Sequence, residues 1–190
     1  MAELKKKFLT KKLLEKIPAE KGWEITAKIL TRLTILRGSK TTAPLLGAGE
    51  GIISPVMGWE KYEEIQAKIM GRAANRFFPM VKEMFSIPVD DAIGAVTLLI
   101  VVGTLMAGPE YKFEIVEAHP ERAVLRRIQC AWWERYNEHK VDPELWVCPA
   151  GHQAWNEEGL KTINPKLTYK LIKALTWGDP FCEAVIEFKR

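Results

Sequence analysis

Reactive side chains gather in the C-terminal half of the chain, around the segment CPAGH at positions 148–152. Proline is favoured at the first position of a helix, so this segment predicts a helix with Cys148 at its N-cap. Unpaired amide donors and the positive end of the helix dipole would there favour a thiolate. His152 and Asn156, one and two turns later, would share its helix face and could act as base and orienting group. The pattern predicts a cysteine nucleophile; the alternative is a half-buried structural thiol beside a surface histidine.

The chain has three cysteines, Cys130, Cys148 and Cys182, which lie far apart in the sequence. Three thiols cannot all pair within one chain, so free thiols in a reducing compartment, the cytoplasm, are expected. Together with His152 they could instead hold a zinc ion. No two of the cysteines have the two-to-four-residue spacing that is typical of a structural zinc site, so we expect no metal and no cofactor.

Aromatic and basic residues surround these thiols in the sequence. Arg126 and Arg127 are neighbours in an expected strand and must point to opposite faces, so one of them can face inward as a carboxylate clamp or in a buried ion pair. We assign both arginines, together with Cys130 and Cys182, to substrate binding. Aromatic side chains form the walls of small-molecule pockets and also fill cores, and the sequence leaves both roles open for Trp132, Trp133, Tyr136, Trp155 and Trp177.

The elements that must position these residues include an antiparallel hairpin and a last strand. Residues 111–115 alternate between polar and apolar side chains, and residues 123–129 are rich in branched ones, with a turn around 119–121. A final strand at 181–188 would direct Cys182 into the core, because apolar residues take every second position from there to Phe188. Helices are expected between these strands, at residues 131–139 and 149–161.

The N-terminal half has helical periodicity. A long helix is expected over residues 59–85, bent or interrupted by Pro79. The most apolar run, residues 92–107, follows two aspartates that suit an N-cap. Sixteen residues cover roughly 24 Å, less than the roughly 30 Å of a bilayer core, so the run predicts a helix buried on all sides rather than a membrane span. Its glycines, Gly94 and Gly103, would let neighbouring backbones approach.

The net charge of +4 is unevenly distributed. Residues 1–40 hold 11 Lys and Arg against 4 Asp and Glu, so the rest of the chain is mildly acidic. A nucleic-acid-binding protein would carry its positive charge on the folded body, which argues against such a partner.

The basic segment starts with an amphipathic helical pattern and lacks the unbroken apolar run of a signal peptide. It is expected to cover the core as a solvated helix; the alternative is contact with a membrane surface or a protein partner.

A chain of 190 residues with 47% hydrophobic and 27% charged residues has the composition of an ordinary globular domain. The composition excludes collagen-like, disulfide-dense and wholly disordered classes. We predict an α+β protein, with a helical N-terminal half packed on a small antiparallel sheet. A cluster of small and breaking residues at 38–44 divides it into a basic helical segment, residues 1–40, and a single domain, residues 41–190.

Several of these features, taken in order, resemble the L-2-amino-thiazoline-4-carboxylic acid hydrolase-like proteins. The resemblance covers roughly residues 60–188 and is carried by FSIPVDD at 85–91, the hairpin running into Cys130, Cys148, INPKL at 163–167 and GDPFCE at 178–183. The ending is also similar to that of vinyl-reductase-type small-molecule-binding domains. Zinc-containing members of that group carry a glutamate and a cysteine where this chain has Leu171 and Ala174, so their zinc site is not expected here.

The first resemblance implies a hydrolase that opens a small cyclic amidine or thioimidate. Such a reaction needs a nucleophile or an activated water, a donor for developing charge, and an anchor for the substrate carboxylate. Cys148 would be the nucleophile, His152 the base, and Arg126 or Arg127 the anchor. The alternative function is a non-catalytic small-molecule-binding or sensor domain with structural thiols. In both cases the expected partner is a small molecule and the expected assembly a homo-oligomer.

Overall fold

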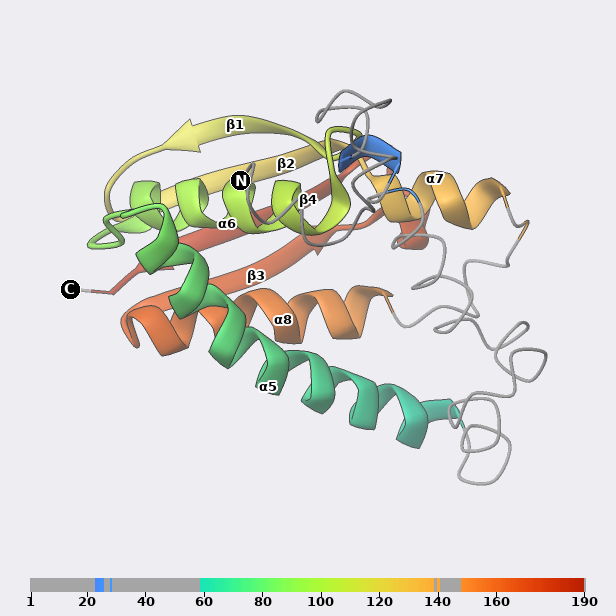
Figure 1. The fold of residues 1–190 in the computed structure, drawn as a ribbon, viewed down its shortest axis with the longest axis horizontal. Helices are drawn as coiled ribbons and strands as arrows, with labels where there is room; N and C mark the ends of the chain where they lie inside the picture. Colours follow the sequence, from blue (N-terminus) through green and yellow to red (C-terminus); the bar gives the residue numbers. More distant parts are fainter. Residues whose placement is uncertain (1–22, 26–27, 29–58, 139, 141–147, 190) are drawn as a thin grey trace, which may run out of the picture.

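The structure is a computed structural model that describes residues 23–25, 28, 59–138, 140 and 148–189 (Figure 1). Most of the predicted basic segment, the boundary at residue 40 and the linker at 38–44 lie outside the described residues. The helices are α5 (Trp59–Met84), α6 (Ala92–Ala107), α7 (Ala131–Glu138), α8 (Cys148–Ile163) and the short 3-10 helix η3 (Leu175–Trp177). The strands are β1 (Lys112–Ala118), β2 (Arg122–Gln129), β3 (Leu167–Lys173) and β4 (Cys182–Phe188).

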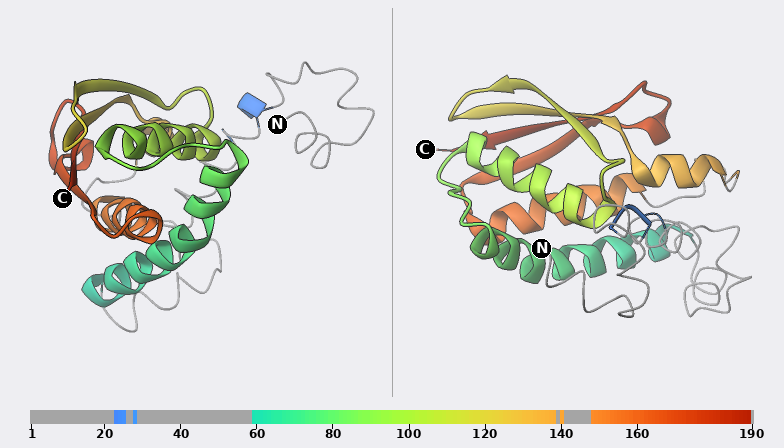
Figure 2. Two further views of the ribbon diagram at one scale, coloured as in Figure 1. Left: turned by 90° about the vertical axis from the view of Figure 1, so that its left-hand side faces the viewer. Right: turned by 45° about the horizontal axis from the view of Figure 1, so that its top comes forward.

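The four strands form one antiparallel sheet in the order β1-β2-β4-β3. Helices α6 and α8 lie on the same face of this sheet, and α5 packs along α8 on the side away from the strands (Figure 2). The predicted α+β class is confirmed. Strand β3 was not predicted, although Leu167, Tyr169 and Leu171 alternate with polar residues and are buried.

Helix α6 begins and ends where the sequence predicts. The side chain of Asp91 accepts a hydrogen bond from the Gly94 amide at 2.8 Å, and Gly108 ends the helix at a positive φ of 79°. At Gly94 an added Cβ would lie 2.3 Å from the carbonyl oxygen of Pro88, so the backbone approach expected there is present. Burial is one-sided, because Ile93 is exposed. Within the described part of the chain, no helix combines the length and apolar character needed to cross a membrane.

Helix α5 continues through Pro79 and ends at Met84. Tyr62, Ala74, Phe78 and Val81 are its most buried side chains. The last three of these are spaced four and three residues apart and mark the face that packs towards α8 and the core.

Candidate ligand-binding site

Strand β2 carries the two adjacent arginines to opposite faces of the sheet, as the alternation predicts. Arg126 lies on the outer face, where its guanidinium forms ion pairs with Glu183 at 2.8 Å and Glu114 at 3.1 Å. Arg127, which pairs in register with Cys182 of β4, points inward to the helices. The sheet thus places one guanidinium in ion pairs on its outer face and the other in the core.

The side chain of Arg127 is 8% exposed, and among the described residues its guanidinium meets an imidazole and two aromatic rings. Its Nη2 lies 2.5 Å from Nε2 of His152, and its guanidinium carbon stands 4.4 Å from the centre of the Tyr111 ring. Its Nε is buried without a hydrogen-bond partner. No carboxylate among the described residues forms an ion pair with Arg127. A guanidinium stays protonated in proteins, so a nearly uncompensated positive charge lies inside the core.

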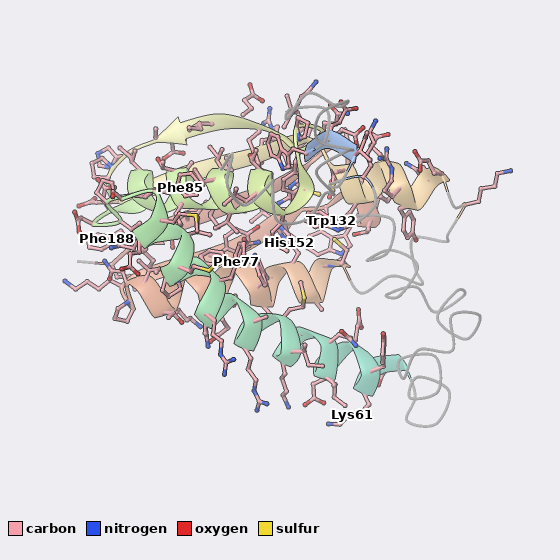
Figure 3. All side chains as sticks on the ribbon, viewed as in Figure 1. Lys61, Phe77, Phe85, Trp132, His152 and Phe188 are labelled. Atoms are coloured by element: carbon pink, nitrogen blue, oxygen red, sulfur yellow. The ribbon has the colours of Figure 1, made fainter. Side chains whose placement is uncertain are left out.

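His152 links this charge to α8 and β3. It points from α8 towards the sheet (Figure 3), where its Nε2 lies 3.0 Å from Nδ2 of Asn156 and its Nδ1 lies 3.3 Å from the hydroxyl of Tyr169. Because Arg127 and Asn156 both donate towards Nε2, that nitrogen must accept, and the network assigns the ring proton to Nδ1. Burial, reinforced by the charge of Arg127, holds the pKa of His152 well below its usual value. The imidazole is therefore neutral.

The lowered pKa of His152 predicts a loss of stability in mild acid. The unfolded chain binds a proton on this side chain near pH 6.5, whereas the folded chain resists it to a much lower pH. The stabilisation is therefore complete above pH 6.5 and declines as the pH falls below it, by up to about 1.4 kcal/mol per pH unit. Urea unfolding between pH 5 and 8 measures this slope.

The variant His152→Gln should flatten the slope between pH 5 and 6.5. His119, which is exposed in the turn between β1 and β2, provides the matched control, and His119→Gln should keep the slope. Glu64, whose pKa Lys61 and Lys68 lower to about 2, loses its contribution only below the pH range used. An unchanged slope in His152→Gln would contradict the assignment of a neutral, buried imidazole.

The three thiols gather around the same buried charge. Cys130 and Cys182 are buried and Cys148 is partly so, and all three are unpaired. Burial raises the pKa of the Cys130 thiol against the opposing effect of Arg127. Burial also raises the pKa of Cys148 well above its usual range, and the other two thiols add to this effect. The thiols of Cys130 and Cys148 are therefore neutral near pH 7 and do not balance the charge of Arg127.

Helix α8 begins at Cys148, one residue before the predicted start, so Cys148 is the first residue of the helix rather than its N-cap. The side chain of Cys148 packs in the cluster around Tyr136, to which Trp132 and Trp133 also belong. The ring nitrogens of His152 face Arg127, Asn156 and Tyr169 instead. The role of Cys148 as a nucleophile stays a prediction. Within the described ranges, no three His, Cys, Asp or Glu side chains are grouped so that they could hold a metal ion.

The tryptophans assigned to the site take different places. Trp132 meets the ring of Tyr111 edge-on, with 5.1 Å between the ring centres. Tyr111 is the ring that the guanidinium of Arg127 faces. Trp133 stacks on Tyr136 at 5.4 Å. Trp155 packs against Phe77 and Phe78 of α5, and Trp177 is 55% exposed. Of these indoles, only Trp132 is in the ring cluster next to Arg127.

Three aromatic residues at the site were not assigned from the sequence: Tyr111, Phe113 and Tyr169. Tyr111 and Phe113 face the guanidinium of Arg127, and Tyr169 reaches His152. The alternation in residues 167–173 could have identified Tyr169 as inward-facing, but it requires that segment to be recognised as a strand. The other two lie in the predicted hairpin, where only the tertiary structure shows which basic residue they meet.

A small cavity lies next to Arg127, with a volume of about 10 Å³. This is close to the space that one water molecule needs. Besides Arg127, the residues of the sheet that line it are aromatic and aliphatic ones with one thiol and one acidic residue, Glu183, whose carboxylate pairs with Arg126: Phe113, Leu125, Tyr169, Leu171, Cys182, Glu183 and Ala184. A groove of about 670 Å³ opens elsewhere, between the ends of α5 and α8, and includes none of the residues around Arg127.

Comparison with known proteins gives a likeness of fold. No family model matches the chain, and no curated protein matches it significantly. The resemblance to the hydrolase-like family therefore remains a prediction. The crystal structure of the phenol-responsive sensory domain of the transcription activator PoxR, with phenol, matches with a TM-score of 0.52 and 12% identity, over 76% of this chain and 73% of that one.

A trafficking protein particle complex subunit 3 from Naegleria fowleri, covalently bound to palmitic acid, has a TM-score of 0.48 and 12% identity. That match covers 88% of this chain and 97% of the other. At such identities a likeness concerns the backbone and transfers no residue of a site. The chain therefore shares its α+β fold with a sensory domain that is similar in structure.

Proposed function

We propose that this chain is a small-molecule-binding domain whose site is the buried cluster around Arg127, between the sheet and α8. The observation that carries the proposal is that Arg127 is buried, that its Nε has no hydrogen-bond partner, and that no carboxylate of the described residues forms an ion pair with it. A buried charge without a partner reduces stability, and perturbed groups of this kind concentrate at functional sites. A ligand that pairs with Arg127 gives this arrangement a purpose.

The surroundings of Arg127 also suit a ligand. Tyr111, Phe113 and Tyr169 supply aromatic surface, and His152 and Asn156 supply polar groups, which together are the usual composition of a small-molecule site. The fold of the phenol-responsive PoxR domain supports this class of function. The cavity of about 10 Å³ is too small for such a ligand, so binding must displace side chains that now fill the site.

Ligand binding can be tested by thermal unfolding of the full chain with small acids, amides and phenols at millimolar concentration. A ligand of the folded state raises the midpoint, and the increase grows with its concentration. Arg127→Met should abolish the increase, whereas Arg126→Met, which alters the neighbouring residue on the outer face, should retain it. Equal increases in wild type and Arg127→Met would show that the site lies elsewhere.

A hydrolase is the second candidate, favoured by the placement of Cys148, His152 and Asn156 at successive turns of α8. It requires a Cys148 thiolate near pH 7. Because burial raises the pKa of Cys148, we expect its alkylation by iodoacetamide in the folded protein to be at least about tenfold slower at pH 7 than that of a free cysteine.

The alkylation rate is measured against pH by mass spectrometry of the peptide that contains Cys148. Cys130→Ser and Cys182→Ser together leave Cys148 as the one remaining cysteine of the sequence and serve as the control for assignment. Fast alkylation with a midpoint below pH 7 would favour the hydrolase over the binding domain.

A further inference from the structure

We infer that the ligand of this site is a carboxylate and that it binds with uptake of a proton by His152. This inference rests on the proposed function and specifies the chemical class of the ligand. Three features support it: the unpartnered Nε of Arg127, the lack of an ion pair between Arg127 and any carboxylate of the described residues, and the acceptor nitrogen of His152 beside the guanidinium.

The neighbouring arginine shows how a carboxylate would be held. On the outer face, Arg126 donates from Nε at 2.9 Å and from Nη2 at 2.8 Å to one carboxylate oxygen of Glu183. On the inner face, the same edge of Arg127 has a buried Nε without a partner and an Nη2 that meets only His152 among the described residues. A ligand carboxylate placed there would repeat on Arg127 the contact that Glu183 makes on Arg126.

The side chains that face Arg127 do not supply this negative charge themselves. Burial raises the pKa of Tyr111 well above its usual value, and it raises the pKa of Tyr169 as well. Burial likewise raises the pKa of Cys130 and of Cys148, so both thiols are neutral near pH 7. A neutral ligand such as a phenol or an amide supplies no negative charge to the guanidinium, whereas a carboxylate places one between Arg127 and His152.

The position of His152 couples binding to a proton. Its Nε2 carries a lone pair that now accepts from Arg127 Nη2, so a carboxylate on the same edge of the guanidinium would bring an oxygen towards that lone pair. The carboxylate oxygen and the lone pair of Nε2 would repel each other. Protonation of Nε2 replaces this repulsion with a charge-assisted hydrogen bond. The titratable groups that face the imidazole are Arg127 from β2 and Tyr169 from β3, and Nδ1 already holds a proton that it directs to Tyr169. The additional proton therefore comes from solvent.

The test is isothermal titration calorimetry of the full chain at pH 7 with matched acids and amides: acetate and acetamide, butyrate and butyramide, benzoate and benzamide. We expect at least one acid to bind about ten- to a hundredfold more tightly than its amide, the range for hydrogen bonds to charged groups. For that acid, the observed enthalpy should differ between phosphate and Tris buffers of equal pH, because the buffer releases the proton that the complex takes up.

Two variants test carboxylate recognition and proton uptake separately. Arg127→Met should remove the preference for acid over amide, and His152→Gln should retain that preference but remove the dependence on buffer. Arg126→Met should change neither. Equal affinity for acid and amide, or an enthalpy independent of buffer in the wild-type protein, overturns the inference and leaves the proposed function standing. If no acid, amide or phenol binds at millimolar concentration, the proposed function fails with it.

Discussion

Replacing Arg127 by methionine is expected to stabilise the protein while abolishing the binding of acids. Methionine has a similar length and fills the space between Tyr111 and His152 without a charge. Substituting buried charges by apolar side chains of similar volume is often stabilising, and we expect a gain of about 2 kcal/mol in the free energy of unfolding. His152 keeps its contacts with Asn156 and Tyr169, so no new unpaired group is created. Urea unfolding and calorimetry with the acids measure the two effects.

The opposite result for the neighbouring residue makes this prediction specific. Arg126→Met removes the ion pairs with Glu183 and Glu114 and should lower the stability, with no effect on binding. A lower stability of Arg127→Met would show that Arg127 has a structural partner and would argue against a site kept at the expense of stability. Arg127→Lys is informative as well, because an ammonium retains the charge but lacks the planar edge.

The second large effect is expected at Gly159 of α8, where the helix crosses α5. A Cβ on this residue would lie 2.5 Å from the ring of Phe78, which is fully buried. The ring would have to shift within a packed core at a cost of about 1–3 kcal/mol, and the roughly 1 kcal/mol that alanine gains over glycine in a helix offsets part of this cost. Gly159→Ala should therefore lower the free energy of unfolding by up to about 2 kcal/mol.

Gly151 on the same helix provides the matched control. Its added Cβ would lie 3.7 Å from Cγ of Met70, which is an ordinary van der Waals distance. Gly151→Ala should therefore raise the free energy of unfolding by about 1 kcal/mol through helix propensity alone. Thermal unfolding of the two variants at one pH compares them directly. If both variants were stabilised, the close approach of α5 to α8 at Phe78 would be contradicted.

The local signals in the sequence were sufficient for most elements. The Asp91 cap and the apolar run predicted α6, and the alternation towards Phe188 predicted β4 with Cys182 in the core. Strand β3 was missed because its short alternating pattern follows directly on α8 and contains lysines. These elements could be predicted since caps and side-chain periodicity act over a few residues.

What the sequence by itself determined about the site was that Arg126 and Arg127 point to opposite faces and that His152 and Asn156 share one side of a helix. Which arginine faces inward was decided only by the tertiary structure, when α6 and α8 covered the face of the sheet that Arg127 occupies. The contact of Arg127 with His152 joins residues from β2 and α8. Local patterns cannot encode such a contact, because burial and its effect on a charge arise only when distant segments pack and exclude water.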